Sequence, residues 1–133
     1  MNGDTKPGAD SGFLRTRLSS VRFALRGIAT VIRTQHNARI HLAATVLVIA
    51  AGFVLRLGAG EWALLTFAIG IVWTAEAANT AIEALADRIT TDSDPQIRRA
   101  KDIAAGSVLL ACIAATVIGL LVLGPHLWAL LAR

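Results

Sequence analysis

Aromatic residues are scarce in this sequence. They make up 5% of 133 residues, whereas 55% of the residues are hydrophobic. A water-soluble domain of this length would alternate apolar and polar positions throughout. Here three stretches are apolar nearly all round over about 20 residues, the length that crosses a bilayer. The composition therefore excludes an ordinary water-soluble domain and predicts an integral membrane protein of one domain.

The sequence also lacks three features that would favour other classes of protein. Its single cysteine, Cys112, excludes an intrachain disulfide and is expected to fill space in the last apolar stretch. No G-x-x-x-x-G-K-[ST] pattern occurs, which excludes a P-loop kinase. Residues 1–12 are small and polar, without the hydrophobic stretch of a cleavable signal, so we expect a disordered tail.

Basic residues are distributed unevenly along the chain, whose net charge is +4. Most basic residues lie before the first apolar stretch or between the second and the third, which three crossings place on the same side of the membrane. Arg56 and Arg133 alone fall on the opposite side. The positive-inside rule therefore predicts a cytoplasmic N-terminus in a multi-pass protein of the plasma or inner membrane. So much apolar surface argues against a nucleic-acid partner. Basic residues at membrane boundaries are better explained by pairing with anionic lipid headgroups.

The periodicity predicts an all-α membrane protein with one surface helix and three transmembrane helices. Over 13–34, apolar residues recur every three or four positions while arginines fall off that stripe, as in an amphipathic helix at a membrane surface. The predicted spans cover about 40–57, 62–86 and 103–123. A cytoplasmic loop is expected over 88–99, which contains a proline and several small polar residues.

A polar stripe interrupts the second span. Glu76, Asn79, Glu83 and Asp87 follow one another at steps of three, four and four, which places them on one helix face. Such side chains can join helices by hydrogen bonds, but intramembrane carboxylates usually face a functional cavity. With Lys101-Asp102 at the mouth of the third span, the carboxylates and amide suit a magnesium-bound phosphate.

Two charged motifs carry a resemblance to a known family. E-A-A-N-T-A-I-E-A-L-A-D occupies 76–87, and A-K-D-I-A-A-G follows at 100–106. Over 22–123 the sequence resembles the prokaryotic diacylglycerol kinases, small membrane lipid kinases that include undecaprenol kinases. The run N-A-R-I-H-L at 37–42 is more similar to the undecaprenol kinase branch. The resemblance implies a homotrimeric bundle with active sites shared between neighbours, ATP as donor, Mg²⁺ as cofactor and a membrane lipid hydroxyl as acceptor.

The resemblance also implies roles for individual residues. Glu76 matches the general base that takes the proton from the lipid hydroxyl, and so contacts the substrate. Glu83 matches a magnesium ligand beside the nucleotide. The other matches are the nucleotide-contacting Lys101 and Asp102, Asn79 on the same polar face, Phe23 near the adenosine, and the basic Arg39 near the lipid.

The chain departs from this family pattern at two places. Gln35 stands where the family often has a glutamate that binds magnesium; an amide oxygen can ligate a hard cation, but without the charge. Ser93-Asp94 stands where the family often carries a Tyr-His pair before Lys-Asp.

Two other functions fit the residues. In a proton- or cation-linked transporter, Glu76 would bind and release the ion. A non-catalytic member of the family would keep the fold without the reaction. The pair Lys101-Asp102 favours the kinase, because a nucleotide site requires such charges and an ion relay does not.

Overall fold

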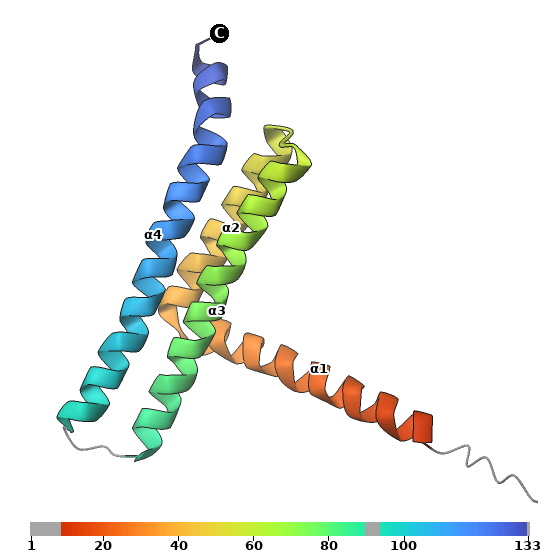
Figure 1. The fold of residues 1–133 in the computed structure, drawn as a ribbon, viewed down its shortest axis with the longest axis vertical. Coiled ribbons are helices and arrows are strands. Elements are labelled where there is room, and N and C mark those ends of the chain that lie inside the picture. The colour runs from red at the N-terminus through yellow and green to blue at the C-terminus, as the bar shows by residue number, and fades with distance from the viewer. Residues whose placement is uncertain (1–8, 90–93, 133) are drawn as a thin grey trace, which may run out of the picture.

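The computed structural model describes residues 9–89 and 94–132 of the chain. These residues form four helices and no strand: α1 (Ala9–Thr34), α2 (His36–Val54), α3 (Ala59–Ile89) and α4 (Pro95–Leu131). Figure 1 shows α2, α3 and α4 side by side, while α1 projects away from one end of this bundle. The predicted all-α class is confirmed for the described part of the chain.

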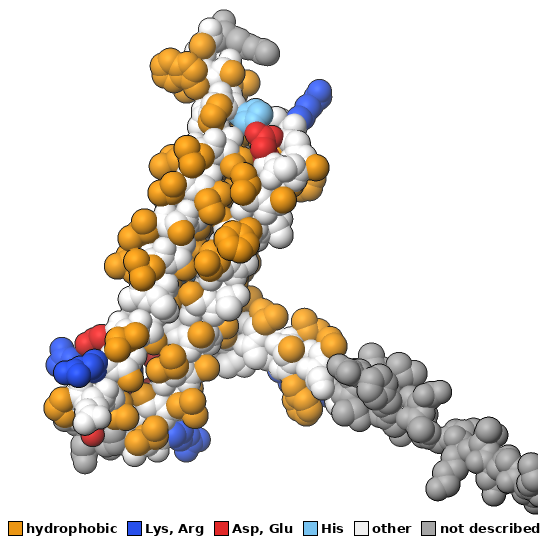
Figure 2. Space-filling model, viewed as in Figure 1, with side chains coloured by type: hydrophobic (Ala, Val, Ile, Leu, Met, Phe, Trp, Pro, Cys, Tyr) orange, Lys and Arg blue, Asp and Glu red, His pale blue; other side chains and the backbone are white. Residues whose placement is uncertain are grey.

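Three of the four helices are long and apolar enough to cross a membrane. The 19 residues of α2 extend over about 28 Å, close to the ~30 Å of a hydrocarbon core. With 31 residues in α3 and 37 in α4, these two helices extend beyond that thickness. Hydrophobic side chains cover the visible outer face of the bundle and charged ones gather toward its ends (Figure 2).

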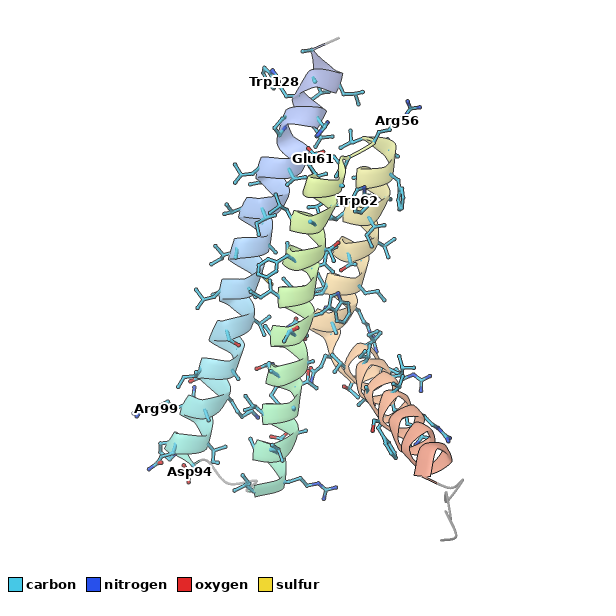
Figure 3. All side chains as sticks on the ribbon, turned by 45° about the vertical axis from the view of Figure 1, so that its right-hand side comes forward. Arg56, Glu61, Trp62, Asp94, Arg99 and Trp128 are labelled. Atoms are coloured by element: carbon cyan, nitrogen blue, oxygen red, sulfur yellow. The ribbon has the colours of Figure 1, made fainter. Side chains whose placement is uncertain are left out.

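The two ends of the bundle carry different residues. Arg56, Glu61, Trp62 and Trp128 lie at one end, and Asp94 and Arg99 lie at the other (Figure 3). Indole rings are favoured at membrane interfaces, so the tryptophans mark one boundary of the apolar length. At that end His126 Nε2 lies 2.7 Å from Glu61 Oε1, which ties the start of α3 to α4.

Helix α1 begins earlier than predicted. It starts at Ala9 rather than near residue 13, so it includes residues 9–12 as well. Residues 1–8 lie outside the described part.

The predicted loop over 88–99 is also shorter in the structure. Helix α3 continues to Ile89, and α4 begins at Pro95. Asp94 caps α4, because its Oδ1 accepts hydrogen bonds from the backbone N–H groups of Gln96 and Ile97 at 2.7 and 3.2 Å. Proline is favoured just after such a cap, since the missing N–H has no partner in a first turn. Asp94, which the sequence analysis placed in the loop, is therefore the N-cap of α4.

The end of α2 is fixed by its backbone. The N–H of Leu57 donates to the carbonyl of Gly52 at 3.1 Å, and that of Arg56 donates to the carbonyl of Phe53 at 3.2 Å. These two bonds form a Schellman motif, which requires a left-handed residue. Arg56 takes that conformation, with φ 55°. The helix therefore ends three residues before the predicted end of the span at residue 57.

Gly52 lets α2 and α3 approach closely at this end of the bundle. A Cβ built on Gly52 would lie 2.8 Å from the indole ring of Trp62 and 3.3 Å from Leu57. The same indole ring packs at a tilt against Phe53, with the centroids 4.9 Å apart. Beside this contact, Leu57, Leu65 and Val122 form a buried cluster that joins the turn to α4.

We expect Gly52→Ala to destabilise the protein, because the rigid Trp62 ring cannot move aside without losing its contact with Phe53. Overpacking of this kind costs about 1–3 kcal/mol. Gly70→Ala is the matched control, since a Cβ there meets nothing within 4 Å. Chemical unfolding in detergent should give a lower free energy of unfolding for Gly52→Ala than for Gly70→Ala; equal values would contradict the close packing.

Candidate functional site

The polar stripe of α3 turns toward the interior of the bundle. Glu76 is only 2% exposed and Asn79 8%, and they are the buried polar side chains among the residues described. Glu83, one turn further along, is half-buried, and Asp87 is exposed. The exposure of the side chains on this stripe thus increases along α3, from the buried Glu76 to the exposed Asp87.

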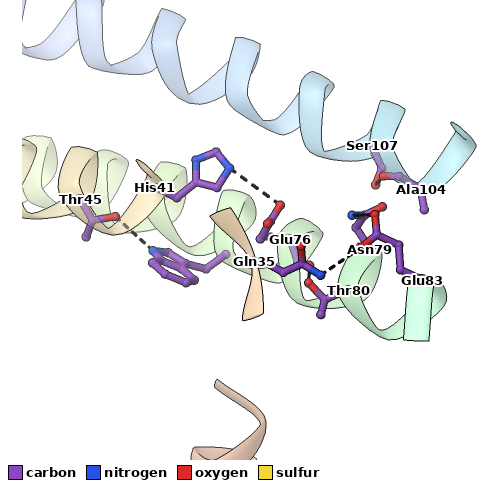
Figure 4. A network of polar contacts seen from close by, with 10 residues as sticks. Gln35, His41, Thr45, Glu76, Asn79, Thr80, Glu83, Ala104 and Ser107 are labelled. Carbon is purple, nitrogen blue, oxygen red and sulfur yellow. Dashed lines mark hydrogen bonds and ion pairs between the residues drawn. The ribbon is translucent and has the colours of Figure 1, made fainter. Parts of the chain in front are cut away.

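Glu83 is held by two amides from different elements (Figure 4). Gln35 Nε2 donates to one carboxylate oxygen at 3.1 Å, and Asn79 Nδ2 donates to the other at 3.1 Å. Gln35 is the residue between α1 and α2, and its backbone is extended, with φ −99° and ψ 124°. That conformation breaks the helix and leaves the side chain free to reach α3.

Glu76 lies opposite His41 of α2. Its Oε2 is 3.9 Å from His41 Nε2, too far for a hydrogen bond. Neither this buried oxygen nor Asn79 Oδ1 has a hydrogen-bond partner among the described residues. Buried polar atoms without partners are costly and rare, so two of them on one helix face make this the candidate functional site.

A cavity of about 310 Å³ adjoins these atoms. Helix α3 contributes Glu76, Asn79 and Glu83 to its lining, α2 contributes His41, and α4 contributes mostly apolar or small residues. The cavity is therefore polar on the side of α3 and apolar on the side of α4. Such a space can receive a hydroxyl attached to an apolar body.

Lys101 and Asp102 lie at the same end of the bundle as Glu83, but neither forms a hydrogen bond with it in the described part of the chain. Lys101 Nζ donates to Asp87 Oδ1 at 3.0 Å, and both side chains are substantially exposed. Asp102 is exposed and makes no ion pair or hydrogen bond with the described residues. Of the departures noted in the sequence, Asp94 caps α4, and Ser93 lies outside the described residues.

Phe23 lies away from the candidate site of its own chain. It is 64% exposed on α1, where Arg26 lies over its ring at 5.9 Å. Helix α1 projects away from the bundle (Figure 1), and among the described residues no ring contact joins Phe23 to Glu76 or Glu83. The structure therefore brings together Gln35, Glu76, Asn79 and Glu83, and leaves Phe23 outside.

Arg39 is engaged by the end of α1. Its guanidinium donates to the backbone carbonyls of Ile32 at 3.4 Å and of Arg33 at 2.8 Å. The last carbonyls of a helix have no partner within it, so Arg39 satisfies two of them and fixes the corner between α1 and α2. This structural task was not evident from the sequence.

The sequence analysis overlooked a second polar stripe. Asn37 and His41 both line the cavity, and Thr45 follows one turn further, so α2 presents polar residues at steps of four. This periodicity could have indicated that α2 faces the stripe of α3. Each residue alone is an unremarkable polar side chain near a membrane boundary, which is why the spacing went unused.

A buried carboxylate and a buried amide beside a cavity, on a helix long enough to span a bilayer, define a membrane protein with a candidate catalytic or binding centre. The sequence model of the prokaryotic diacylglycerol kinases matches residues 22–123. The chain belongs to this family. All the residues gathered at the site fall within the matched region.

Two characterised relatives cover most of the chain. It is 39% identical to the undecaprenol kinase of Bacillus subtilis over 77% of its own length and 83% of that protein. It is 37% identical to the diacylglycerol kinase of Synechocystis over 96% of its own length and 77% of that protein. Family membership supports a membrane-bound lipid kinase, and kinases in general use a divalent metal ion.

For Arg39→Ala we expect a local loosening of the corner between α1 and α2, because two carbonyls of α1 lose their donor. Amide hydrogen exchange should become about tenfold faster in the residues around the end of α1, with the three-helix bundle unaffected. Arg22→Ala, an exposed arginine earlier in α1, is the control. Unchanged exchange in both variants would contradict the capping role.

Proposed function

We propose that the protein is an ATP-dependent lipid kinase that transfers the γ-phosphate of ATP to a lipid hydroxyl, on diacylglycerol or undecaprenol. The observation that carries the proposal is the buried Glu76 carboxylate, whose Oε2 lacks a donor and adjoins a half-apolar cavity. A lipid hydroxyl placed there would donate to that oxygen. The relatives named as an undecaprenol kinase and a diacylglycerol kinase support this assignment.

In this mechanism Glu76 is the catalytic base and contacts the lipid substrate. Its oxygen accepts the hydroxyl proton as the hydroxyl oxygen attacks the γ-phosphorus and ADP leaves. Because the side chain is almost fully buried, water does not compete for the position of the attacking hydroxyl. His41, 3.9 Å away, lies close enough to help orient the carboxylate.

The residues around Glu83 fit a magnesium ion as cofactor. Mg²⁺ prefers carboxylate and amide oxygens and keeps phosphate oxygens and waters in its shell. Glu83 supplies a carboxylate, and Asn79 has a buried oxygen without a partner. Gln35 can turn its amide and offer its oxygen in place of its N–H groups. When bound, Mg²⁺ would neutralise charge on the phosphates of ATP.

The nucleotide is proposed to bind at the polar end, beside Glu83, Asn79, Lys101 and Asp102. Lys101 can exchange its partner Asp87 for a phosphate at small cost, because that ion pair is exposed to solvent. Exposed Asp102 is free to accept hydrogen bonds from the nucleotide. We place this end, with the N-terminus, on the cytoplasmic side of the plasma or inner membrane.

A homotrimer with active sites shared between neighbours is part of the proposal. Phe23, proposed to lie near the adenosine, is exposed on a helix that points away from its own site, so a neighbouring chain would bring it there. Many large hydrophobic side chains of α2, α3 and α4 are exposed and can pack against other chains or lipid. Arg39 would contact the lipid headgroup from the corner between α1 and α2.

The test of this function is transfer of labelled γ-phosphate from Mg-ATP to diacylglycerol and to undecaprenol in mixed micelles. Wild-type protein should phosphorylate at least one lipid, and Glu76→Gln should lose about a hundredfold or more of kcat, because the amide cannot take the proton. Nucleotide binding by Glu76→Gln should stay near the wild-type level. Full turnover by this variant, or no transfer to either lipid by folded wild type, would overturn the assignment in favour of a transporter or a non-catalytic member.

Gln35→Glu tests the proposed metal position. It sets a second carboxylate against Glu83 in place of an N–H donor, which should lower the melting temperature without metal. Added Mg²⁺ should restore stability, and the Mg²⁺ concentration for half-maximal transfer should fall. Gln35→Met, which removes the donor without adding charge, is the control. A higher Mg²⁺ requirement for Gln35→Glu would show that Gln35 lies outside the metal shell.

A further inference from the structure

A second, larger cavity adjoins the candidate site. It has a volume of about 430 Å³ and lies between α2, α3 and α4. His41 and Cys112 line both this cavity and the smaller one around Glu76, so the two are neighbours. Apart from His41, its lining is apolar or small except for two threonines, Thr45 and Thr116.

Thr45 differs from the other described threonines with recorded hydrogen bonds. Five of these donate their hydroxyl to the backbone carbonyl four residues earlier in the same helix, as is common for threonine in helices. Thr45 instead faces α3, where its Oγ1 accepts a hydrogen bond from Trp73 Nε1 at 3.1 Å (Figure 4). The five are Thr30, Thr34, Thr74, Thr80 and Thr116.

This arrangement leaves the hydroxyl proton of Thr45 without an acceptor among the described residues. An indole N–H can only donate, so the threonine oxygen must be the acceptor and its own proton stays available. A hydroxyl donor beside an apolar cavity is unfavourable when unpaired. A ligand with an oxygen acceptor at this depth would relieve that cost.

The position of Thr45 indicates which oxygen that is. Thr45 lies one helical turn, about 6 Å along α2, beyond His41, the neighbour of Glu76. In a diacylglycerol the nearest ester carbonyl lies only a few bonds from the free hydroxyl. A polyprenol carries no oxygen besides its hydroxyl, so it has nothing to offer Thr45.

We propose that Thr45 is a specificity-determining residue: it donates a hydrogen bond to an ester carbonyl of a diacylglycerol-type acceptor whose acyl chain occupies the larger cavity. This inference rests on the proposed lipid kinase function. Trp73 acts as a positioning residue, since its N–H holds the threonine hydroxyl away from its own helix. The acceptor class is therefore an acylglycerol rather than a polyprenol.

The test compares kcat/KM for three acceptors in mixed micelles: a diacylglycerol, the matching dialkylglycerol with ether linkages, and undecaprenol. The ether lipid keeps the hydroxyl and both chains but lacks the carbonyl. Wild type should prefer the ester over the ether about five- to tenfold, the effect of one hydrogen bond. Thr45→Val should lower kcat/KM for the ester by that factor and leave the ether and undecaprenol within about twofold; Thr45→Ser should retain the preference.

A double-mutant cycle separates positioning from packing. Trp73→Phe allows the Thr45 hydroxyl to turn to its own helix, so the ester preference should fall, and adding Trp73→Phe to Thr45→Val should change the preference no further. If Thr45→Val instead lowers kcat/KM for all three lipids alike, or for none of them, Thr45 does not bind the carbonyl and the inference is overturned.

The occupant of the larger cavity is tested with Gly119→Leu. Gly119 lines the cavity, and a Cβ there meets nothing within 4 Å, so the new side chain starts without a clash and extends from the cavity wall. We expect a severalfold higher KM for diacylglycerol and an unchanged oligomeric size. A changed oligomeric size with an unchanged KM would mean that a second copy fills the cavity, against the inference. Gly70→Leu, outside the cavity, is the control.

Failure of the inference and failure of the proposed function give different results. Absence of transfer to any of the three lipids by folded wild type would overturn the kinase assignment itself. Transfer without ester preference, or with undecaprenol preferred in both wild type and Thr45→Val, would overturn only the role of Thr45.

Discussion

The burial of a carboxylate between apolar helices is the constraint on which the rest of the structure depends. Glu76 is 2% exposed, and one of its oxygens has no donor. Such burial is unfavourable unless the surroundings supply polar partners. The protein supplies few inside its own chain: His41 stands at 3.9 Å, and the amide of Asn79 is committed to Glu83. The folded chain therefore retains a buried acceptor without a donor, which the proposed substrate hydroxyl would satisfy.

Two facing stripes of polar residues, rather than any single residue, build the site. On α3 the stripe runs through Glu76, Asn79 and Glu83, and on α2 it runs through His41 and Thr45. Helix α4 closes the other side with buried small and apolar residues, Ala104, Val108 and Ala111, which let it pack closely against α3. The arrangement places polar groups on two walls and leaves the third apolar, as the proposed acceptor, a hydroxyl on a long apolar tail, would require.

Features that depend on the periodicity of a single helix could be predicted from the sequence, whereas contacts between two elements could not. Periodicity alone placed Glu76, Asn79 and Glu83 on one face and identified three apolar helices, because these properties follow from 3.6 residues per turn. The contact between Gln35 and Glu83 depends on an extended backbone at a helix junction, which composition does not reveal. In the same way, the pairing of Lys101 with Asp87 depends on how α3 and α4 align, and periodicity within one helix carries no such information.

The lengths of the helices suit chemistry at a boundary between lipid and water. Gln35, at the start of the shortest spanning helix, contacts Glu83, so Glu83 lies near the level where that helix meets the interface. Glu76 comes seven residues before Glu83 in α3, about 10 Å nearer the middle of the bundle. In the proposed reaction, a phosphate donor dissolved in water and a hydroxyl anchored in lipid would meet across this interval. Helices α3 and α4 are longer than α2, and the exposed pair Asp87 and Lys101 joins them at the same end as Glu83.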